Sequence, residues 1–381
     1  MSKLRSIFLY LLASLSRLGA RRRPTELRTI LVVKPDALGD LLLATPALRR
    51  LRQGLPAARI VGTVGPWSRI MWANNPDLDA LDELPFPGFG RTRARHPYWL
   101  LLRAALLLRR QKYDAALLLR DDHWWGAALI ALAGIPLRIG HAHPLCAPFL
   151  TEALPYNPTE HVSRQSLAVA EKLIDMTREP DSEPQPPSPA LRFEPSPADH
   201  TWAASWLHRQ LGPGERFVVI HPGASGPTKA WPAERWASLG DALAGRGLRV
   251  VLTGGTSEVA LAQQVADQMQ RPALSVAGAT AIGQLAALLA HTSLVVGGDT
   301  GPLHIAVSQG CPTIHLFGPS DPARFGPWGD PQRNRVLSAG LACSPCSNFS
   351  VCPRKTDPAE CMQAITLAQV LSAIESLMRD T

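Results

Sequence analysis

The chain has 381 residues, enough for two domains with separate hydrophobic cores. Hydrophobic residues make up 46% and charged residues 18%, a composition that excludes disorder over most of the length. The formal charge of +8 suggests a nucleic-acid partner until it is located. Residues 1–30 hold seven basic residues against one acidic residue, a charge of +6, which leaves only +2 elsewhere. We therefore expect no nucleic-acid partner.

Residues 1–27 form a predicted basic amphipathic helix. The apolar run is interrupted well short of the roughly 20 residues that a transmembrane helix needs. Arg17 and the arginines at 21–23 stand where a secretory signal needs small residues. We expect this helix to lie on an anionic membrane surface, and a helix packed on the protein's own surface is the alternative. Its apolar residues recur at helical spacing: Leu4, Ile7, Phe8, Leu11, Leu12, Leu15 and Leu18.

Predicted strands and helices alternate from residue 28 to residue 179, which we expect to form an N-terminal α/β domain. The predicted strands cover residues 29–34, 59–64 and 114–119, and the predicted helices 41–51, 98–110 and 162–176. Seven prolines follow between residues 179 and 197, and they break any helix. Residues 180–197 are therefore the predicted linker between two domains.

A second α/β domain is predicted over residues 198–361, with a parallel, doubly wound sheet. The loops that leave the carboxyl ends of its strands carry glycine and meet at one edge, where such sheets bind ligands. A last helix within residues 362–381 begins with a capping box at Thr366 and Gln369, and we expect it to dock across both halves. The predicted strands are 217–220, 249–252, 274–276, 294–296 and 313–317, and the helices 233–244, 258–268, 282–290 and 303–309.

The most informative of these loops reads Gly297-Gly298-Asp299-Thr300-Gly301, between an apolar strand and a helix. Glycine lets a ligand approach the backbone, and free N–H groups at a helix start attract anions. We expect Asp299 or Thr300 to cap this helix. An ordinary strand–turn–helix joint is the alternative, but five such loops together favour a phosphate-bearing ligand. The sequence has neither a Walker A motif nor a Gly-x-Gly-x-x-Gly after the first strand.

Several motifs together make the chain resemble the family 9 glycosyltransferases, the ADP-heptose:lipopolysaccharide heptosyltransferases. The resemblance covers nearly all of residues 28–378 and implies the GT-B fold, in which two Rossmann-like doubly wound domains face a cleft. It depends on KPDALGDLLLATPAL at 34–48, HPGAS at 221–225, KAWP at 229–232, GDTGPLH at 298–304 and LFGP at 316–319.

Through this resemblance, Asp40 of the Gly-Asp pair is the expected general base for inverting transfer, and a plain helix cap is the alternative. Lys229 is the expected phosphate ligand, in place of a metal ion. The resemblance implies no cofactor and no metal. Further nucleotide-sugar contacts are expected from Ser225, Thr228, Glu258, Asp299, Thr300, Gly301 and His304.

Some of these residues also suit a purely structural role. His304 also suits a structural hydrogen-bond partner, and Glu258 also suits a favourable charge at a helix start. Asp77-Leu-Asp79 spells an Asp-x-Asp string but reads as a solvated turn. Four cysteines suit either a zinc or iron–sulfur site or a thiol-rich surface loop: Cys343, Cys346, Cys352 and Cys361.

The expected function is therefore transfer of a heptose from ADP-heptose to the lipid A–core oligosaccharide of lipopolysaccharide. We expect a cytoplasmic enzyme, peripheral on the inner face of the inner membrane. The alternatives are a GT-B protein that only binds a nucleotide sugar, a nucleotide-sugar epimerase, and a transferase of a different sugar.

Overall fold

The computed structural model describes residues 26–88, 96–177 and 188–379. The chain divides into two compact units between Pro189 and Ala190, inside the range predicted as the linker. The predicted helix over residues 1–27 lies almost entirely outside the described residues. None of the helices in the described ranges combines the length and the apolar character needed to cross a bilayer.

The N-terminal unit is built on a parallel sheet with the strand order β3-β2-β1-β4-β5-β6. The order reverses between β1 and β4, which pair from Ile30 with Ala115 to Val33 with Leu118. All four of these residues are buried, as expected for central strands covered on both faces. The strands are β1 (Thr29–Lys34), β2 (Arg59–Val64), β3 (Ala80–Glu83), β4 (Ala115–Leu118), β5 (Leu137–His141) and β6 (Glu152–Leu154).

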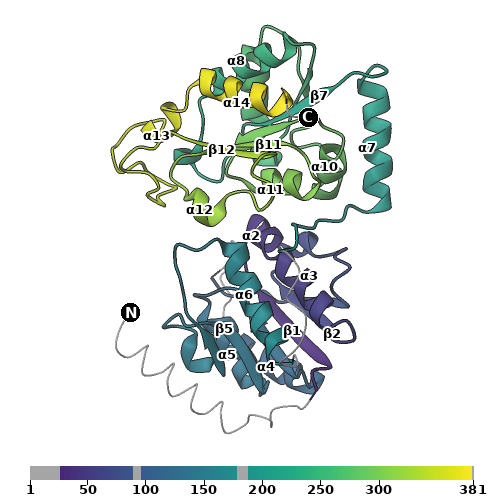
Figure 1. Cartoon of the computed structure of the whole chain (residues 1–381), viewed down its shortest axis with the longest axis vertical. Helices are drawn as coiled ribbons and strands as arrows, with labels where there is room; N and C mark the ends of the chain where they lie inside the picture. The colour runs from purple at the N-terminus through teal and green to yellow at the C-terminus, as the bar shows by residue number, and fades with distance from the viewer. Residues whose placement is uncertain (1–25, 89–95, 178–187, 380–381) are drawn as a thin grey trace. The chain divides into compact units, whose positions relative to one another are not determined.

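Two helical layers cover this sheet. Helices α3 and α6 pack against each other in one layer, and α4 and α5 in the other (Figure 1). Short η helices complete the connections, η1 (Arg69–Met71) and η2 (Ala147–Phe149). The helices of this unit are α2 (Leu38–Leu43), α3 (Thr45–Gly54), α4 (Pro97–Gln111), α5 (Trp124–Leu132) and α6 (Val162–Asp175).

The C-terminal unit repeats the same topology, with the strand order β12-β11-β10-β7-β8-β9. Its order reverses between β7 and β10, where Val219 pairs with Val295 and His221 with Gly297. The two units therefore share one doubly wound arrangement, in which ligands bind beyond the carboxyl ends of the strands where the order reverses. The strands are β7 (Phe217–His221), β8 (Arg249–Leu252), β9 (Leu274–Ser275), β10 (Val295–Gly298), β11 (Thr313–Phe317) and β12 (Asn334–Ser338).

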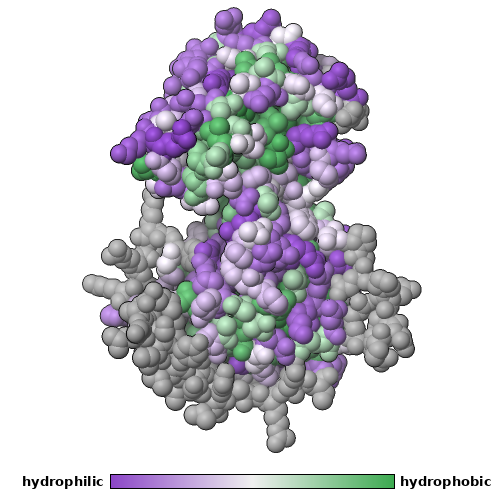
Figure 2. All heavy atoms as spheres, turned by 60° about the vertical axis from the view of Figure 1, so that its left-hand side comes forward, coloured by the Kyte–Doolittle hydropathy of each residue, from purple (hydrophilic) through white to green (hydrophobic). Residues whose placement is uncertain are grey.

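Helices and apolar side chains cover both faces of the second sheet. The space-filling view shows apolar residues in patches among hydrophilic ones on both units (Figure 2). The α-helices are α7 (Pro197–Gln210), α8 (Ala233–Ala244), α9 (Val259–Gln268), α10 (Ile282–Leu289), α11 (Gly301–Ser308), α12 (Pro322–Phe325), α13 (Glu360–Gln363) and α14 (Leu367–Arg379), and the short η helices are η3 (Pro227–Lys229) and η4 (Thr256–Glu258).

The last helix, α14, belongs to the C-terminal core. Val370, Ile374 and Leu377 are buried in the same cluster as residues of β7, β8 and β10. The helix contacts α8, β11 and β12, and Figure 1 shows it beside α8. The apolar face that we expected to dock across both halves therefore packs within the C-terminal unit.

The sequence patterns missed several elements. Strands β3, β5, β6 and β12 and helices α5 and α7 were not expected. The edge strands β3 and β6 hold no fully buried residue, so they lack the apolar signature of a central strand. Strand β5 is fully buried but contains Arg138, whose guanidinium donates to the carbonyls of Ile135 and Phe149. Because the charged Arg138 interrupts the apolar residues of this segment, hydropathy did not predict a buried strand here.

Candidate functional site

A network of charged side chains occupies the switch point of the N-terminal sheet. Lys34 ends β1, Asp36 follows it, and Arg120 follows β4 next to it. The Lys34 ammonium lies 3.0 Å from Asp36 Oδ2 and donates to the Leu119 carbonyl at 2.9 Å. Arg120 bonds Asp36 Oδ1 through Nη1 and Asp122 Oδ1 through Nε, the latter at 2.6 Å. Lys34 and Asp36 are buried, so this network is partly desolvated.

Asp40 stands in the first turn of α2, beside this network. Its surroundings raise the pKa of the carboxyl to about 7, first through burial and then through the negative charge of Asp36. Lys34 and Arg120 act in the opposite direction, and a hydrogen bond with Asp36 favours the protonated form. The pKa of Asp36 is instead lowered, because Lys34 and Arg120 outweigh the effect of its burial. One ionised carboxylate thus sits beside one that accepts a proton near neutral pH.

Asp40 is not the cap of its helix. Ala37 is the N-cap residue of α2 and provides no side-chain cap, and Asp40 is the third residue of the helix. Leu41, Leu42 and Leu43 are buried, and Trp72 Nε1 donates to the Leu41 carbonyl at 2.9 Å. Burial on one side holds this short helix in place and leaves Asp40 only partly buried. The alternative role as a plain helix cap is therefore wrong.

A second charged cluster lies at the switch point of the C-terminal sheet. Lys229 ends η3, and Asp299 follows β10. The Lys229 ammonium donates to Asp299 Oδ2 at 2.6 Å and to the Asp299 carbonyl at 3.3 Å, and it lies 4.6 Å from the centre of the Phe349 ring. An ammonium has three N–H groups, so one is left for a further acceptor.

The Asp299 carboxylate organises this cluster. Burial alone raises its pKa, but the nearby His304 ring and the charge and hydrogen bond of Lys229 outweigh burial and hold the pKa well below its usual range. His304 Nε2 lies 3.9 Å from Asp299 Oδ1. Thr300 is the N-cap residue of α11, which confirms one of the two expected positions, but its hydroxyl makes no side-chain cap and donates to the Gly298 carbonyl at 3.4 Å. The Asp299 carboxylate is not the cap and accepts from Lys229 instead.

Two buried histidines extend this cluster inward. His304 and His315 have ring centres 5.9 Å apart, and His315 Nε2 lies 2.8 Å from the Thr313 hydroxyl. Burial, and then the proximity of His304, lowers the pKa of His315 to about 3, so this ring is neutral. His304 Nδ1 is buried and has no hydrogen-bond partner among the described residues. A buried, unpartnered ring nitrogen is costly unless a ligand or water satisfies it.

Glycines bring backbone close to side chains around this edge. A Cβ on Gly223 would lie 2.0 Å from Glu258 Oε1, and one on Gly297 would lie 2.4 Å from Leu303 Cδ2. Glu258 ends η4 and accepts from the Gly255 N–H at 2.7 Å. The loops after β7 and β8 therefore meet at Gly223 and Glu258.

The remaining expected site residues differ in their exposure. Ser225 is exposed, whereas Thr228 is buried and donates to the Asn348 carbonyl at 2.8 Å. Gly301 begins α11 next to Thr300. The Thr228 hydroxyl therefore anchors the loop around Asn348 by donating a hydrogen bond, a role that the sequence did not suggest.

The four clustered cysteines share one small cavity of about 20 Å³, which Thr228 also lines. All four are free thiols, and they range from buried Cys361 to exposed Cys346. Across the described residues, no three or more histidine, cysteine or acidic side chains are arranged to hold a metal ion. Asp79 of the Asp-x-Asp string is likewise not part of such a group, and its carboxylate pairs with Arg52 at 2.6 Å. Asp77 is buried and Asp79 is exposed, so only one carboxylate of this turn is solvated as expected.

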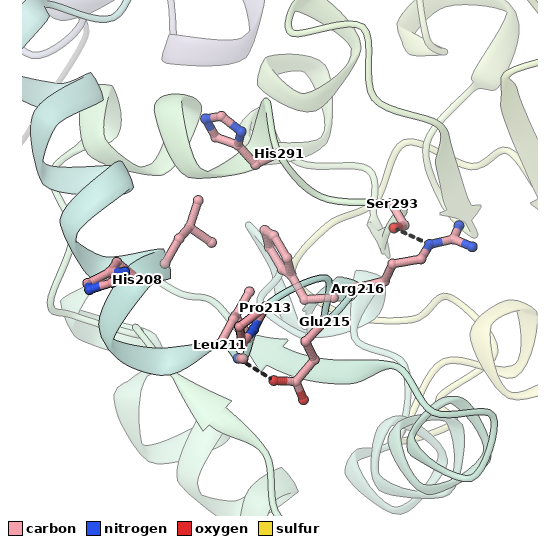
Figure 3. Close-up of a pocket in the computed structure, with 10 residues that line it drawn as sticks. His208, Leu211, Pro213, Glu215, Arg216, His291 and Ser293 are labelled. Carbon is pink, nitrogen blue, oxygen red and sulfur yellow. Dashed lines mark hydrogen bonds between the residues drawn. The ribbon is translucent and has the colours of Figure 1, made fainter.

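A larger hollow of about 550 Å³ lies elsewhere on the C-terminal unit. It is bordered by the end of α7, the residues before β7 and the segment after α10, and Figure 3 shows His208, Glu215, Arg216 and His291 around it. This is the amino-terminal edge of the sheet, opposite to the edge that binds ligands in doubly wound folds. Lys229 and Asp299 do not line it, so we do not assign it to the site.

Comparison with known proteins identifies the family. The model of glycosyltransferase family 9 (heptosyltransferase) matches residues 101–354. The chain belongs to this family. It is therefore a glycosyltransferase, and the two charged clusters are candidates for its catalytic and donor-binding groups.

Curated relatives and solved structures agree with this assignment. The chain is 30% identical over 297 residues to lipopolysaccharide heptosyltransferase 3 of Escherichia coli, which spans 76% of the chain and 82% of the relative. It is 25% identical to lipopolysaccharide heptosyltransferase 1 of Salmonella typhimurium, over 84% of the chain and 96% of the relative.

The solved structures show that the fold is of the GT-B type. A family 9 glycosyl transferase from Veillonella parvula aligns with a TM-score of 0.77 and 24% identity, covering 95% of this chain and all of that one. E. coli ADP-heptose lps heptosyltransferase II aligns with a TM-score of 0.73 and 22% identity, covering 92% and 99%.

Sequence reasoning named Asp40, Lys229, Asp299 and His304, and the structure brings the last three together. The sequence alone did not predict the residues that surround Asp40. Asp36 lies four residues before Asp40, in the loop that joins β1 to α2, so two carboxylates after β1 were a usable signal. Arg120 was not accessible to such reasoning, because only the pairing of β1 with β4 brings it close.

Proposed function

We propose that this glycosyltransferase transfers a heptose from ADP-heptose to the inner core of lipopolysaccharide, with inversion and without a metal ion. The observation that carries the proposal is a family 9 chain whose Asp40 has a pKa of about 7 beside an ionised Asp36. Such a carboxylate is a proton acceptor matched to neutral pH. The relatives, lipopolysaccharide heptosyltransferases 1 and 3, support the substrate class.

Asp40 is the proposed general base in this reaction. As the acceptor hydroxyl attacks the anomeric carbon, its proton passes to the Asp40 carboxylate while the bond from the sugar to the diphosphate breaks. Asp36 is a positioning residue in this scheme, because its charge and hydrogen bond raise the pKa of Asp40. Lys34 and Arg120 keep Asp36 ionised, so the proton goes to Asp40 and not to its neighbour.

Lys229 is the proposed partner of the leaving diphosphate. Asp299 accepts two of its N–H groups and fixes the ammonium, which leaves the third for a phosphate oxygen. The backbone N–H groups at the start of α11, from Thr300 and Gly301, add partial positive charge where negative charge develops. A solved E. coli heptosyltransferase complex with ADP carries the nucleotide that we propose here.

The other donor contacts are proposed from the loops at the same edge. Glu258 is suited to accept from ribose hydroxyls. The buried His304 Nδ1 is suited to a sugar or phosphate group, and Ser225 is exposed beside η3.

We further propose that the acceptor is the lipid A–core oligosaccharide and that the enzyme acts at the cytoplasmic face of the inner membrane. The amphipathic residues 1–27 would then hold the chain on the anionic surface that carries this acceptor. The alternative to action at the membrane is a soluble cytoplasmic enzyme that acts on a released acceptor.

Donor choice and reaction type are tested in two steps. Thermal shift with ADP, UDP and GDP should show stabilisation by ADP alone, since binding to the folded state raises stability. Release of labelled heptose should then depend on a heptose-accepting core oligosaccharide. Release without acceptor would indicate an epimerase or hydrolase. Binding without any transfer to an authentic acceptor would indicate a nucleotide-sugar-binding protein, and preference for another nucleotide would indicate a different sugar.

A further inference from the structure

Helix α4 of the N-terminal unit has an apolar face on each side. Its inner face, with Leu101, Ala104 and Ala105, is buried in the core against α5 (Figure 1). Its outer face is also apolar, and Trp99 and Leu106 are exposed to 69% and 63%. A surface helix of a soluble protein normally carries polar side chains on its outer face.

The outer face is a continuous stripe. Trp99, Leu102 and Leu106 follow one another at spacings of three and four residues, which places them on one side of the helix. Ten large hydrophobic side chains are exposed in the described part of the chain, and five of them lie on α4, namely Tyr98, Trp99, Leu102, Leu106 and Leu107. Scattered exposed apolar residues need no explanation, but a concentration on one helix marks an interaction surface.

The charges on this helix have one sign. Residues 96–112 contain no aspartate or glutamate but include Arg103, Arg109, Arg110 and Lys112, all exposed. None of these four forms an ion pair with another described residue. At the other end of the helix, the exposed Tyr98 ring lies 6.3 Å from that of Trp124. Apolar side chains, unpaired cations and interfacial aromatic rings on one surface are the features of a helix that lies in a lipid headgroup region.

We propose that α4 is a membrane-docking helix whose outer face enters the headgroup layer of an anionic bilayer. Two copies paired through this face would bring like-charged arginines together, so charge complementarity favours anionic lipid over a second copy. The surface consists of described residues of α4. Lipid binding by this surface does not depend on the proposed reaction, because it would occur in the absence of donor and acceptor.

The test is flotation of the full-length chain with vesicles of phosphatidylethanolamine and phosphatidylglycerol, against vesicles of phosphatidylcholine alone. The double variant Leu102→Gln/Leu106→Gln should weaken binding to anionic vesicles on the order of a hundredfold, since each buried leucine contributes about tenfold. The double variant Arg109→Gln/Arg110→Gln should weaken it on the order of twentyfold and reduce its salt dependence. Val336→Gln/Val351→Gln removes two exposed apolar side chains from the C-terminal unit and should change nothing.

All substituted side chains are exposed, so the variants should melt within a few degrees of the wild type. Transfer to a water-soluble core oligosaccharide should stay at the wild-type rate, so failure of the docking proposal is distinguishable from failure of the proposed reaction. Wild-type flotation of both α4 variants would overturn the proposal. It would also be overturned if the leucine variant converted a dimer into a monomer, measured by light scattering, with unchanged flotation. The same holds if only substitutions at residues 21–23 released the chain from vesicles.

Discussion

Replacing Asp36 by asparagine removes a negative charge from beside Asp40 and leaves the side-chain shape nearly unchanged. Asp36 contributes to the raised pKa of Asp40 in two ways, through its charge and through a hydrogen bond with the protonated Asp40. In Asp36→Asn, the ammonium of Lys34 and the guanidinium of Arg120 remain but lose the carboxylate between them. Both cations then act on Asp40 without competition from Asp36, while Asp122 still pairs with Arg120.

The expected size of the effect follows from these charges. Cations within a few ångströms lower a carboxyl pKa by about 1–3 units, and loss of the Asp36 charge acts in the same direction. The pKa of Asp40 should therefore fall from about 7 to about 5 or below. A weaker base accepts the acceptor proton less readily, so the plateau rate at high pH should fall on the order of tenfold.

The assay is the pH dependence of kcat/KM for heptose transfer, whose acidic limb reports the free enzyme's base. The limb should lie near pH 7 for the wild type and about two units lower for Asp36→Asn. Asp122→Asn is the matched control, because Asp122 also pairs with Arg120 but does not contribute to the pKa of Asp40. An unshifted acidic limb in a folded Asp36→Asn enzyme would refute the reasoning.

Three further outcomes are expected. Lys229→Met should lower kcat/KM on the order of 100-fold or more, with Lys229→Arg retaining part of the rate, because a fixed cation is lost from the leaving group; activity that is unaffected by Lys229→Met would contradict this role. Gly223→Ala should raise the KM for the donor, measured at saturating acceptor, since its Cβ would meet Glu258 at 2.0 Å and displace that side chain. The folded-state pKa of Asp40 lies above its unfolded value, so the native state loses stability as pH rises from about 4 to about 7. Asp40→Asn should therefore raise the unfolding free energy at pH 8 by up to about 4 kcal/mol, seen as a higher Tm in calorimetry, and leave it nearly unchanged at pH 4. Equal effects at both pH values would contradict the raised pKa.

The fold was predictable where strands are apolar and central. Strands β1, β2, β8 and β11 were expected with the bounds that the structure gives, because buried parallel strands read as continuous apolar runs. Strand β12 was missed because its residues alternate between covered and exposed at the sheet edge. Helix α7 was missed because polar residues dilute its apolar positions, although Ser196 and Asp199 form a capping box at its start.

The site was predictable where a motif is local. Asp40, Lys229 and Asp299 all follow the carboxyl ends of strands, so the doubly wound pattern indicated this edge, and the family motifs indicated these residues. The partner relations were not predictable. That Asp299 pairs with Lys229, 70 residues away, follows from the pairing of β7 with β10 and from no local sequence signal.

The most direct test of Asp40 as general base is single-turnover transfer of labelled heptose by Asp40→Asn at pH 8. We expect the rate to fall between about 10²-fold and 10⁴-fold, the usual contribution of a positioned base, while stabilisation by ADP in thermal shift stays at the wild-type level. Near-normal transfer by a folded Asp40→Asn enzyme would contradict the role of Asp40 and would remove the reason for the buried network of Lys34, Asp36 and Arg120 around it.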